Sequence, residues 1–155
     1  MISYLKWKVI ELDFLSVTIL TSGGIGYDVW INELTYSKLW LESEVWIYVY
    51  HHITENNQSL FGFIELEEKK VFSELIKISW VWWKVAMQIL SLWIERLVIA
   101  ISWKDNKTIE WIKWIWKKMA EKIILELKDK DFWIIISSSE TMTRAKTISA
   151  DLHTS

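Results

Sequence analysis

The hydrophobic pattern of this 155-residue chain changes period near Glu65, and that change limits the folds available to it. Before this point, short runs rich in Val, Ile, Tyr and Phe alternate with turn residues, which is typical of β-strands. After it, apolar residues such as Val71, Phe72 and Leu75 recur on one helical stripe. The chain is therefore predicted to be α+β, with the strands first and the helices second.

Five strands are predicted in the first part of the chain, which favours a small barrel. They span Lys8–Leu12, Leu15–Thr21, Gly26–Ile31, Val45–Ile53 and Ser59–Ile64. Glycines at 23, 24 and 26 form a tight connection, and the polar run Glu55–Gln58 forms a hairpin tip.

Helices are predicted from Glu65 onward, joined in the pattern helix, tight turn, helix, twice over. After the first helix they span Lys84–Leu92, Glu95–Ser102, Asn106–Ile112 and Lys117–Lys128. The expected division is residues 1–63, 64–131 and 132–155. In the last segment a brief apolar run, Phe132–Ile136, gives way to a Thr/Ser-rich end that lacks core-forming residues, and this tail is expected to be disordered.

Two connections between these helices have related sequences. Trp80-Val-Trp-Trp-Lys-Val-Ala86 is followed 34 residues later by Trp114-Ile-Trp-Lys-Lys-Met-Ala120. A turn written Gly-hydrophobic-Gly-x-Lys-x-Ala binds anions, because glycine lets a phosphate approach backbone N–H groups beside a helix N-terminus. Here the hydrophobic, Lys and Ala positions are retained in both copies, and tryptophan stands where this device needs glycine.

Composition points to the same replacement. A chain of this length would ordinarily hold roughly 11 glycines and 8 prolines, whereas this one has 4 glycines, no proline and 13 tryptophans. UGA, one base from the glycine codon GGA, means tryptophan in some genetic codes and glycine in others. We therefore hypothesise that many of these tryptophans are UGA codons that specify glycine.

Charge and residue content exclude several classes of function. The net charge of −2 requires any nucleic-acid contact to come from a local basic face. The absence of cysteine excludes disulfides and thiolate metal sites. His51 and His52 are adjacent in a strand and face opposite sides, so they cannot share a metal. No catalytic residue, cofactor or metal site is predicted, nor a signal peptide or membrane span.

With these motifs, the chain resembles the RuvA family of Holliday-junction branch-migration subunits. The resemblance runs from Met1 to about Lys130 and includes Gly23-Gly-Ile-Gly-Tyr27, Leu60-Phe-Gly-Phe63, Phe72-Ser-Glu-Leu-Ile-Lys77 and Lys117-Lys-Met-Ala-Glu-Lys122. It implies an N-terminal five-stranded OB-type β-barrel followed by an all-α domain with two helix-hairpin-helix motifs. It also implies a non-catalytic, cytoplasmic subunit that binds four-way junction DNA in recombination, repair and the SOS response.

The resemblance assigns roles residue by residue. Trp7 also falls on a family glycine, and Glu55 and Asn56 match an acidic pin that faces the junction crossover, with one acid where the family has a pair. The residues implied at the DNA backbone are Trp80, Val81, Trp82, Lys84, Trp114, Ile115, Trp116, Lys117, Lys118 and Lys122.

The implied partners are the RuvB ATPase, which supplies the energy for branch migration, and the RuvC resolvase. The implied assembly is a homotetramer or octamer. Because the chain ends where the family's linker leads into a third domain, we expect a version without that RuvB-contacting domain, which binds junctions but couples poorly to the motor.

Two alternatives remain open if the indoles are genuine. One is a sequence-neutral single-stranded DNA-binding OB protein, since such barrels stack bases on aromatic rings. The other is a Trp-rich membrane-interface protein, in which the segment 111–118 interleaves aromatic and cationic residues.

The codon hypothesis predicts the gene sequence. The codons for Trp7, Trp80, Trp82, Trp114 and Trp116 are expected to be UGA, and those for the four glycines to be of the GG type. Sequencing the gene checks this, and UGG at the hairpin positions would contradict it.

Overall fold

A computed structural model describes residues 1–91, 106–110 and 115–129. The chain divides into two compact units, residues 1–69 and 70–155. The helix predicted at Glu95–Ser102, the tail 132–155 and Trp114 lie outside the described residues.

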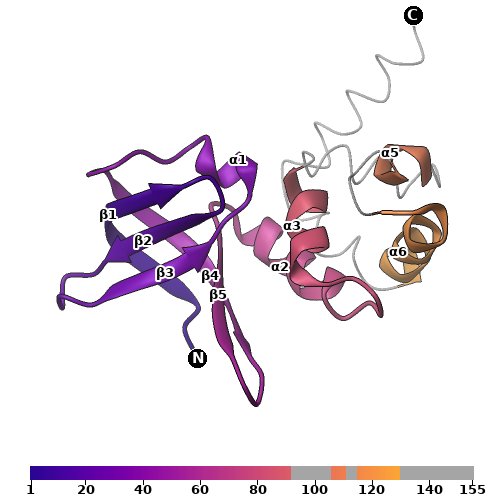
Figure 1. Ribbon diagram of the computed structural model, residues 1–155, viewed down its shortest axis with the longest axis horizontal. Helices are drawn as coiled ribbons and strands as arrows, with labels where there is room; N and C mark the ends of the chain where they lie inside the picture. The colour runs from indigo at the N-terminus through magenta and orange to yellow at the C-terminus, as the bar shows by residue number, and fades with distance from the viewer. Residues whose placement is uncertain (92–105, 111–114, 130–155) are drawn as a thin grey trace, which may run out of the picture. The chain divides into compact units, whose positions relative to one another are not determined.

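The first unit is built on a closed five-stranded barrel with strand order β1-β2-β3-β5-β4 (Figure 1). Neighbouring strands are antiparallel except β3 and β5, which close the barrel through one parallel pair, Trp30 with Phe61. The strands are β1 (Tyr4–Asp13), β2 (Ser16–Leu20), β3 (Gly26–Trp30), β4 (Glu44–Ile53) and β5 (Gln58–Phe63). With the helices that follow, this confirms the predicted α+β class.

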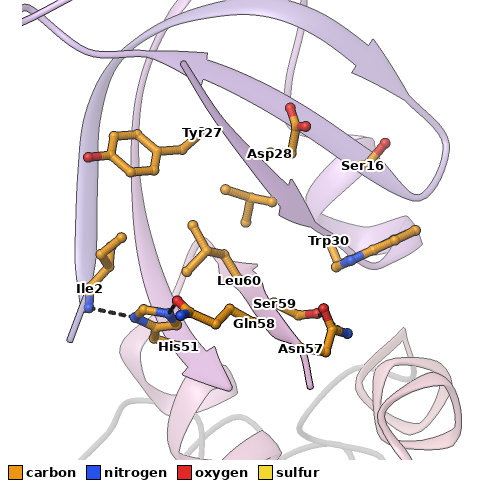
Figure 2. Close-up of a pocket in the computed structure, with 11 residues that line it drawn as sticks. Ile2, Ser16, Tyr27, Asp28, Trp30, His51, Asn57, Gln58, Ser59 and Leu60 are labelled. Atoms are coloured by element: carbon orange, nitrogen blue, oxygen red, sulfur yellow. Dashed lines mark hydrogen bonds between the residues drawn. The ribbon is translucent and has the colours of Figure 1, made fainter. Parts of the chain in front are cut away.

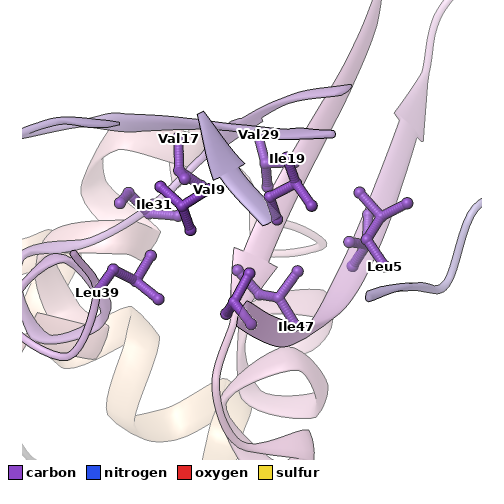
Figure 3. Close-up of a cluster of buried hydrophobic side chains, with 10 residues drawn as sticks. Leu5, Val9, Val17, Ile19, Val29, Ile31, Leu39 and Ile47 are labelled. Atoms are coloured by element: carbon purple, nitrogen blue, oxygen red, sulfur yellow. The ribbon is translucent and has the colours of Figure 1, made fainter. Parts of the chain in front are cut away.

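Alternate residues of the strands fill the barrel (Figure 3). In β4, for example, Val45, Ile47 and Val49 are buried while Glu44 and Trp46 are exposed. This period of two places the β-branched residues of each strand on the same side of the sheet, where they pack together. The core cluster comprises Leu5, Val9, Val17, Ile19, Val29, Ile31, Leu39, Val45, Ile47 and Val49.

β1 begins at Tyr4, so the predicted start at Lys8 was wrong. Residues 4–8 pair with β4, and the strand then pairs with β2 from Lys8 onward. Tyr4 and Lys6 are exposed, which makes this part of the strand hard to recognise from the sequence. It is defined by its pairing with β4, about forty residues away.

A short helix, α1 (Glu33–Tyr36), was not predicted. Asn32 caps it, because its side-chain oxygen accepts a hydrogen bond from the Thr35 N–H at 2.8 Å. The Asn-Glu pair could have indicated this helix start, but a helix of a single turn is too short to show a repeating apolar pattern.

Gly62 lies in β5 where the backbone packs closely against core side chains. A Cβ added there would lie 2.5 Å from Ile47 Cδ1 and 2.6 Å from Val29 Cγ1. Since real Cβ contacts are never that short, the residue at this position has to be glycine for the strand to close against β4.

α2 (Leu66–Leu75) starts with an acid that bonds back to the preceding backbone. Glu68 is 2% exposed, and its Oε2 accepts a hydrogen bond from the Glu65 N–H at 3.1 Å. This is the acidic half of a capping box. Burial raises the pKa of Glu68, while the hydrogen bond from Glu65 and the charge of Lys38 act in the opposite direction.

The helices after α2 are α3 (Trp83–Ser91), α5 (Asn106–Glu110) and α6 (Lys117–Asp129). Apolar faces of α3 and α6 supply buried residues, among them Ile89, Leu90, Ile123 and Leu127. Within the described segments, no helix is both long enough and apolar enough to cross a bilayer.

Gly62→Ala is expected to destabilise the fold by about 1–3 kcal/mol, because overpacking forces core side chains to move. Gly23→Ala is the matched control, since a Cβ there meets nothing within 4 Å and should change the free energy of unfolding by less than about 0.5 kcal/mol. Urea unfolding measures both, and equal effects would contradict the packing argument.

Glu68→Gln keeps the hydrogen-bond acceptor but removes the buried charge. The pKa of Glu68 in the folded state is raised above its unfolded value. The contribution of Glu68 to wild-type stability is therefore most favourable below the unfolded pKa and falls as pH rises through the folded pKa. The stability advantage of the variant is therefore expected to grow from acidic to neutral pH. Urea midpoints across pH measure it, with Glu67→Gln as control; an advantage independent of pH would refute this cause.

Candidate nucleic-acid interface

The first repeated segment forms the tight turn between α2 and α3. The turn closes with a hydrogen bond from the Val81 N–H to the Ile78 carbonyl at 3.1 Å. Ile78 and Val81 are both 4% exposed, whereas Trp80 and Trp82 are each 65% exposed. The hydrophobic residue thus anchors the turn in the core while the residues on either side of it face outward.

The described part of the second repeated segment, residues 115–120, has the same burial pattern at the start of α6. Ile115 is 7% exposed and Trp116 is 55% exposed. The Ala120 N–H donates to the Trp116 carbonyl at 3.0 Å, as the Ala86 N–H donates to the Trp82 carbonyl at 3.1 Å. Both alanines are fully buried. Trp80, Trp82 and Trp116 therefore lie at the surface and are not part of a buried helical core.

The charges at the starts of α3 and α6 are opposite in sign to those that stabilise a helix N-terminus. The first turns of α3 and α6 contain no acidic residue, and Lys84, Lys117 and Lys118 lie there with exposed side chains. α2, by contrast, carries Glu67 and Glu68 in its first turn. Since a helix N-terminus is partially positive, lysine there is unfavourable unless an anion is also present. The two turns therefore suit a phosphate.

Two of the predicted basic residues contact indoles. The ammonium of Lys84 lies 5.4 Å from the centre of the Trp83 ring, and that of Lys122 lies 4.7 Å from the centre of the Trp80 ring. The second contact joins α6 to the first turn, and no sequence spacing signalled it. It brings a lysine of α6, two residues beyond the second repeat, to the first repeat within the second unit.

The predicted pin residues lie at the tip of the β4–β5 hairpin, which extends from the barrel as a long two-stranded arm (Figure 1). The Thr54 N–H donates to the Asn57 carbonyl at 2.8 Å, and the Asn57 N–H donates to Thr54 Oγ1 at 3.1 Å. Glu55 and Asn56 between them are exposed. The tip therefore presents one carboxylate on a hydrogen-bonded turn.

The barrel also has a surface pocket of about 700 Å³ beside β3 and β5 (Figure 2). Its imidazole, His51, accepts a hydrogen bond from the Ile2 N–H through Nδ1 and contacts Gln58 Oε1 through Nε2, both at 3.1 Å. Its carboxylate, Asp28, accepts from Thr18 Oγ1 at 2.7 Å. Through these contacts Asp28 joins β3 to β2 and His51 joins β4 to β5, so both side chains hold strands together.

The two histidines have separate environments. While His51 lies in the pocket, the ring of His52 stacks on Tyr50 with centroids 6.3 Å apart. Among the residues that the structure describes, no group of three His, Cys, Asp or Glu side chains is placed to hold a metal ion.

Comparison with known proteins identifies relatives over most of the chain. Residues 1–62 match the family described as RuvA N terminal domain. The Holliday junction branch migration complex subunit RuvA of Acidobacterium capsulatum is 40% identical over 114 residues, covering 72% of this chain and 58% of the relative. The protein of the same name from Sulfurimonas denitrificans is 39% identical over 124 residues, covering 79% and 65%.

A third relative of that name, from Psychrobacter cryohalolentis, is 32% identical over 140 residues, which is 90% of this chain and 68% of the relative. The chain spans about three-fifths of the length of the first two curated relatives that it matches.

Proposed function

Because this chain belongs to the RuvA family, we propose that it is a non-catalytic subunit that binds four-way junction DNA during branch migration. The relatives carry the name of a Holliday junction branch migration complex subunit, and the proposal extends that role to this chain. It places the protein in the cytoplasm, in recombination, repair and the SOS response.

The observation that carries the proposal is the repeated turn with lysines at the following helix start. Each turn buries one apolar anchor and presents backbone and a lysine outward, so each suits one stretch of phosphate backbone. Two such turns in one unit would grip a duplex without reading its bases. The proposed contacts are Trp80, Val81, Trp82, Lys84, Trp114, Ile115, Trp116, Lys117, Lys118 and Lys122.

The β4–β5 hairpin has a different role in this proposal. Glu55 at its tip repels phosphates and so keeps the strands apart at the crossover, with Asn56 beside it. One carboxylate per subunit is a weak pin, but a tetramer would bring four near the junction centre.

Movement of the junction requires energy from a partner, since the proposed role involves no chemistry by this chain. The partner is the RuvB ATPase, and the RuvC resolvase would act on the same junction. The proposed assembly is a homotetramer or octamer, because a four-way junction offers each of four subunits one equivalent arm.

Exposed indoles beside lysines also favour a second candidate function, binding of single-stranded DNA by base stacking. The two candidates differ in substrate preference. A backbone-gripping protein prefers junctions and duplex arms, whereas a stacking protein prefers unpaired bases.

Removing the proposed phosphate contacts tests the function. The double variant Lys84→Gln/Lys118→Gln is expected to weaken binding to a four-way junction for every arm sequence, and to reduce the slope of log K against log salt by about two. Gel shift and fluorescence anisotropy measure this against a single strand of the same sequence.

Lys128→Gln is the matched control, because it removes an exposed lysine from the far end of α6. Its effect on junction affinity is expected to be small. Tighter binding to the single strand than to the junction would refute the proposal in favour of base stacking, and binding to anionic vesicles but not to DNA would favour a membrane-interface role.

A further inference from the structure

One face of the β4–β5 arm continues the inner face of the barrel. Alternate residues of a strand face the same side, so Val49, His51 and Ile53 of β4 share this face. Val49 is fully buried in the barrel, His51 is partly buried, and Ile53 is 55% exposed. The face therefore runs from the core of the barrel to the tip of the arm, next to the turn that carries Glu55.

The surface pocket of about 700 Å³ lies along this face (Figure 2). Ile53 pairs with Gln58 and His51 pairs with Leu60, and all of these except Ile53 line the pocket. Asn57 lines it as well, and its carbonyl accepts the hydrogen bond that closes the turn at the tip. The pocket therefore extends from the barrel to the tip of the arm.

The lining of the pocket suits a flat, uncharged ligand with polar edges. Its apolar and aromatic side chains are Ile2, Tyr27, Val29, Trp30 and Leu60. The amides of Asn57 and Gln58 add hydrogen-bond donors and acceptors. The volume also lies within the range of about 300–1,000 Å³ that is typical of small-molecule sites.

The same lining disfavours a phosphate. It includes no lysine or arginine, and its carboxylate, Asp28, repels anions. His51 adds no charge in this arrangement, because its Nδ1 accepts the hydrogen bond from the Ile2 N–H and therefore carries no proton. The pocket thus differs from the two lysine-bearing turns, which suit the phosphate backbone, and its chemistry suits a base.

We propose that this pocket receives an unpaired nucleobase at the junction crossover, and that Ile53 is the apolar surface at its entrance. The proposal rests on the proposed function, in which Glu55 keeps the strands apart where they exchange. Proteins recognise unpaired bases by stacking them on aromatic rings and by hydrogen bonds to their edges. Tyr27 provides the ring, and Asn57 and Gln58 provide the hydrogen-bonding groups. While a base occupies the pocket, it cannot pair again with its former partner.

Fluorescence anisotropy with two four-way junctions tests the proposal. One junction is fully paired, and the other carries a single unpaired adenine at the crossover, because side-chain amides pair well with an adenine edge. The full chain is expected to bind the second junction about fivefold more tightly, at the lower end of what one stacked base contributes. Gln58→Ala removes an amide from the pocket and Ile53→Ala removes the apolar entrance, so each is expected to bring the ratio of the two affinities close to one.

Ile25→Ala is the matched control for Ile53→Ala, because Ile25 has the same 55% exposure but lies in the connection between β2 and β3. It is expected to keep the preference for the unpaired adenine. Equal affinity of the unaltered chain for the two junctions would overturn the proposal, as would a preference that survives both pocket variants. If those variants alter the sedimentation of the chain instead, the pocket is covered by a second copy and the proposal is wrong.

A dinucleotide of 2-aminopurine and thymidine separates the pocket from the junction. Its fluorescence is expected to fall on addition of the full chain, since a stacked 2-aminopurine is quenched, and Gln58→Ala is expected to remove most of this change. Quenching of the dinucleotide without binding of any junction would refute the proposed function and leave the base pocket standing. Binding of both junctions with equal affinity and without quenching would refute the pocket and leave the proposed function standing.

Discussion

Close approach of backbone to neighbouring groups, with no room for a side chain, is the constraint on which this structure depends. At Gly62 the wall of the barrel touches its own core, and a single added carbon would collide with Ile47 and Val29. Because β3 and β5 share only one residue pair, closure depends on β5 packing tightly against β4. The barrel that carries the β4–β5 arm therefore depends on a residue without a side chain.

The same constraint applies to the helical unit, where it concerns binding as well as packing. In the proposed function, a turn that presents backbone N–H groups to a phosphate must leave space beside the chain, while the anchors Val81 and Ile115 are buried in the core. The lysines at the starts of α3 and α6 forgo favourable helix electrostatics. This arrangement becomes favourable when an anion occupies the turn.

Sequence alone predicted much of the fold, for reasons visible in particular residues. β-branched residues at alternate positions, such as Val45, Ile47 and Val49, identified the strands, and the anchor, Lys and Ala positions of the first repeat identified the turn before α3. The first half of β1 and the capped turn α1 were missed, because one depends on pairing with a distant strand and the other is too short to show a period. Burial of Glu68 was not predicted, because it arises from tertiary packing and not from a local pattern.

What the sequence by itself determined is the order of elements, the family and the positions where tryptophan stands in a glycine pattern, because these depend on local residue types and spacing. Only the tertiary structure decided that none of the described indoles is buried, that the backbone at Trp7 and Trp80 has positive φ, and that Lys122 reaches the Trp80 ring. Exposure, backbone angle and contact between α6 and the first turn arise when separate segments pack together, and no local pattern encodes them.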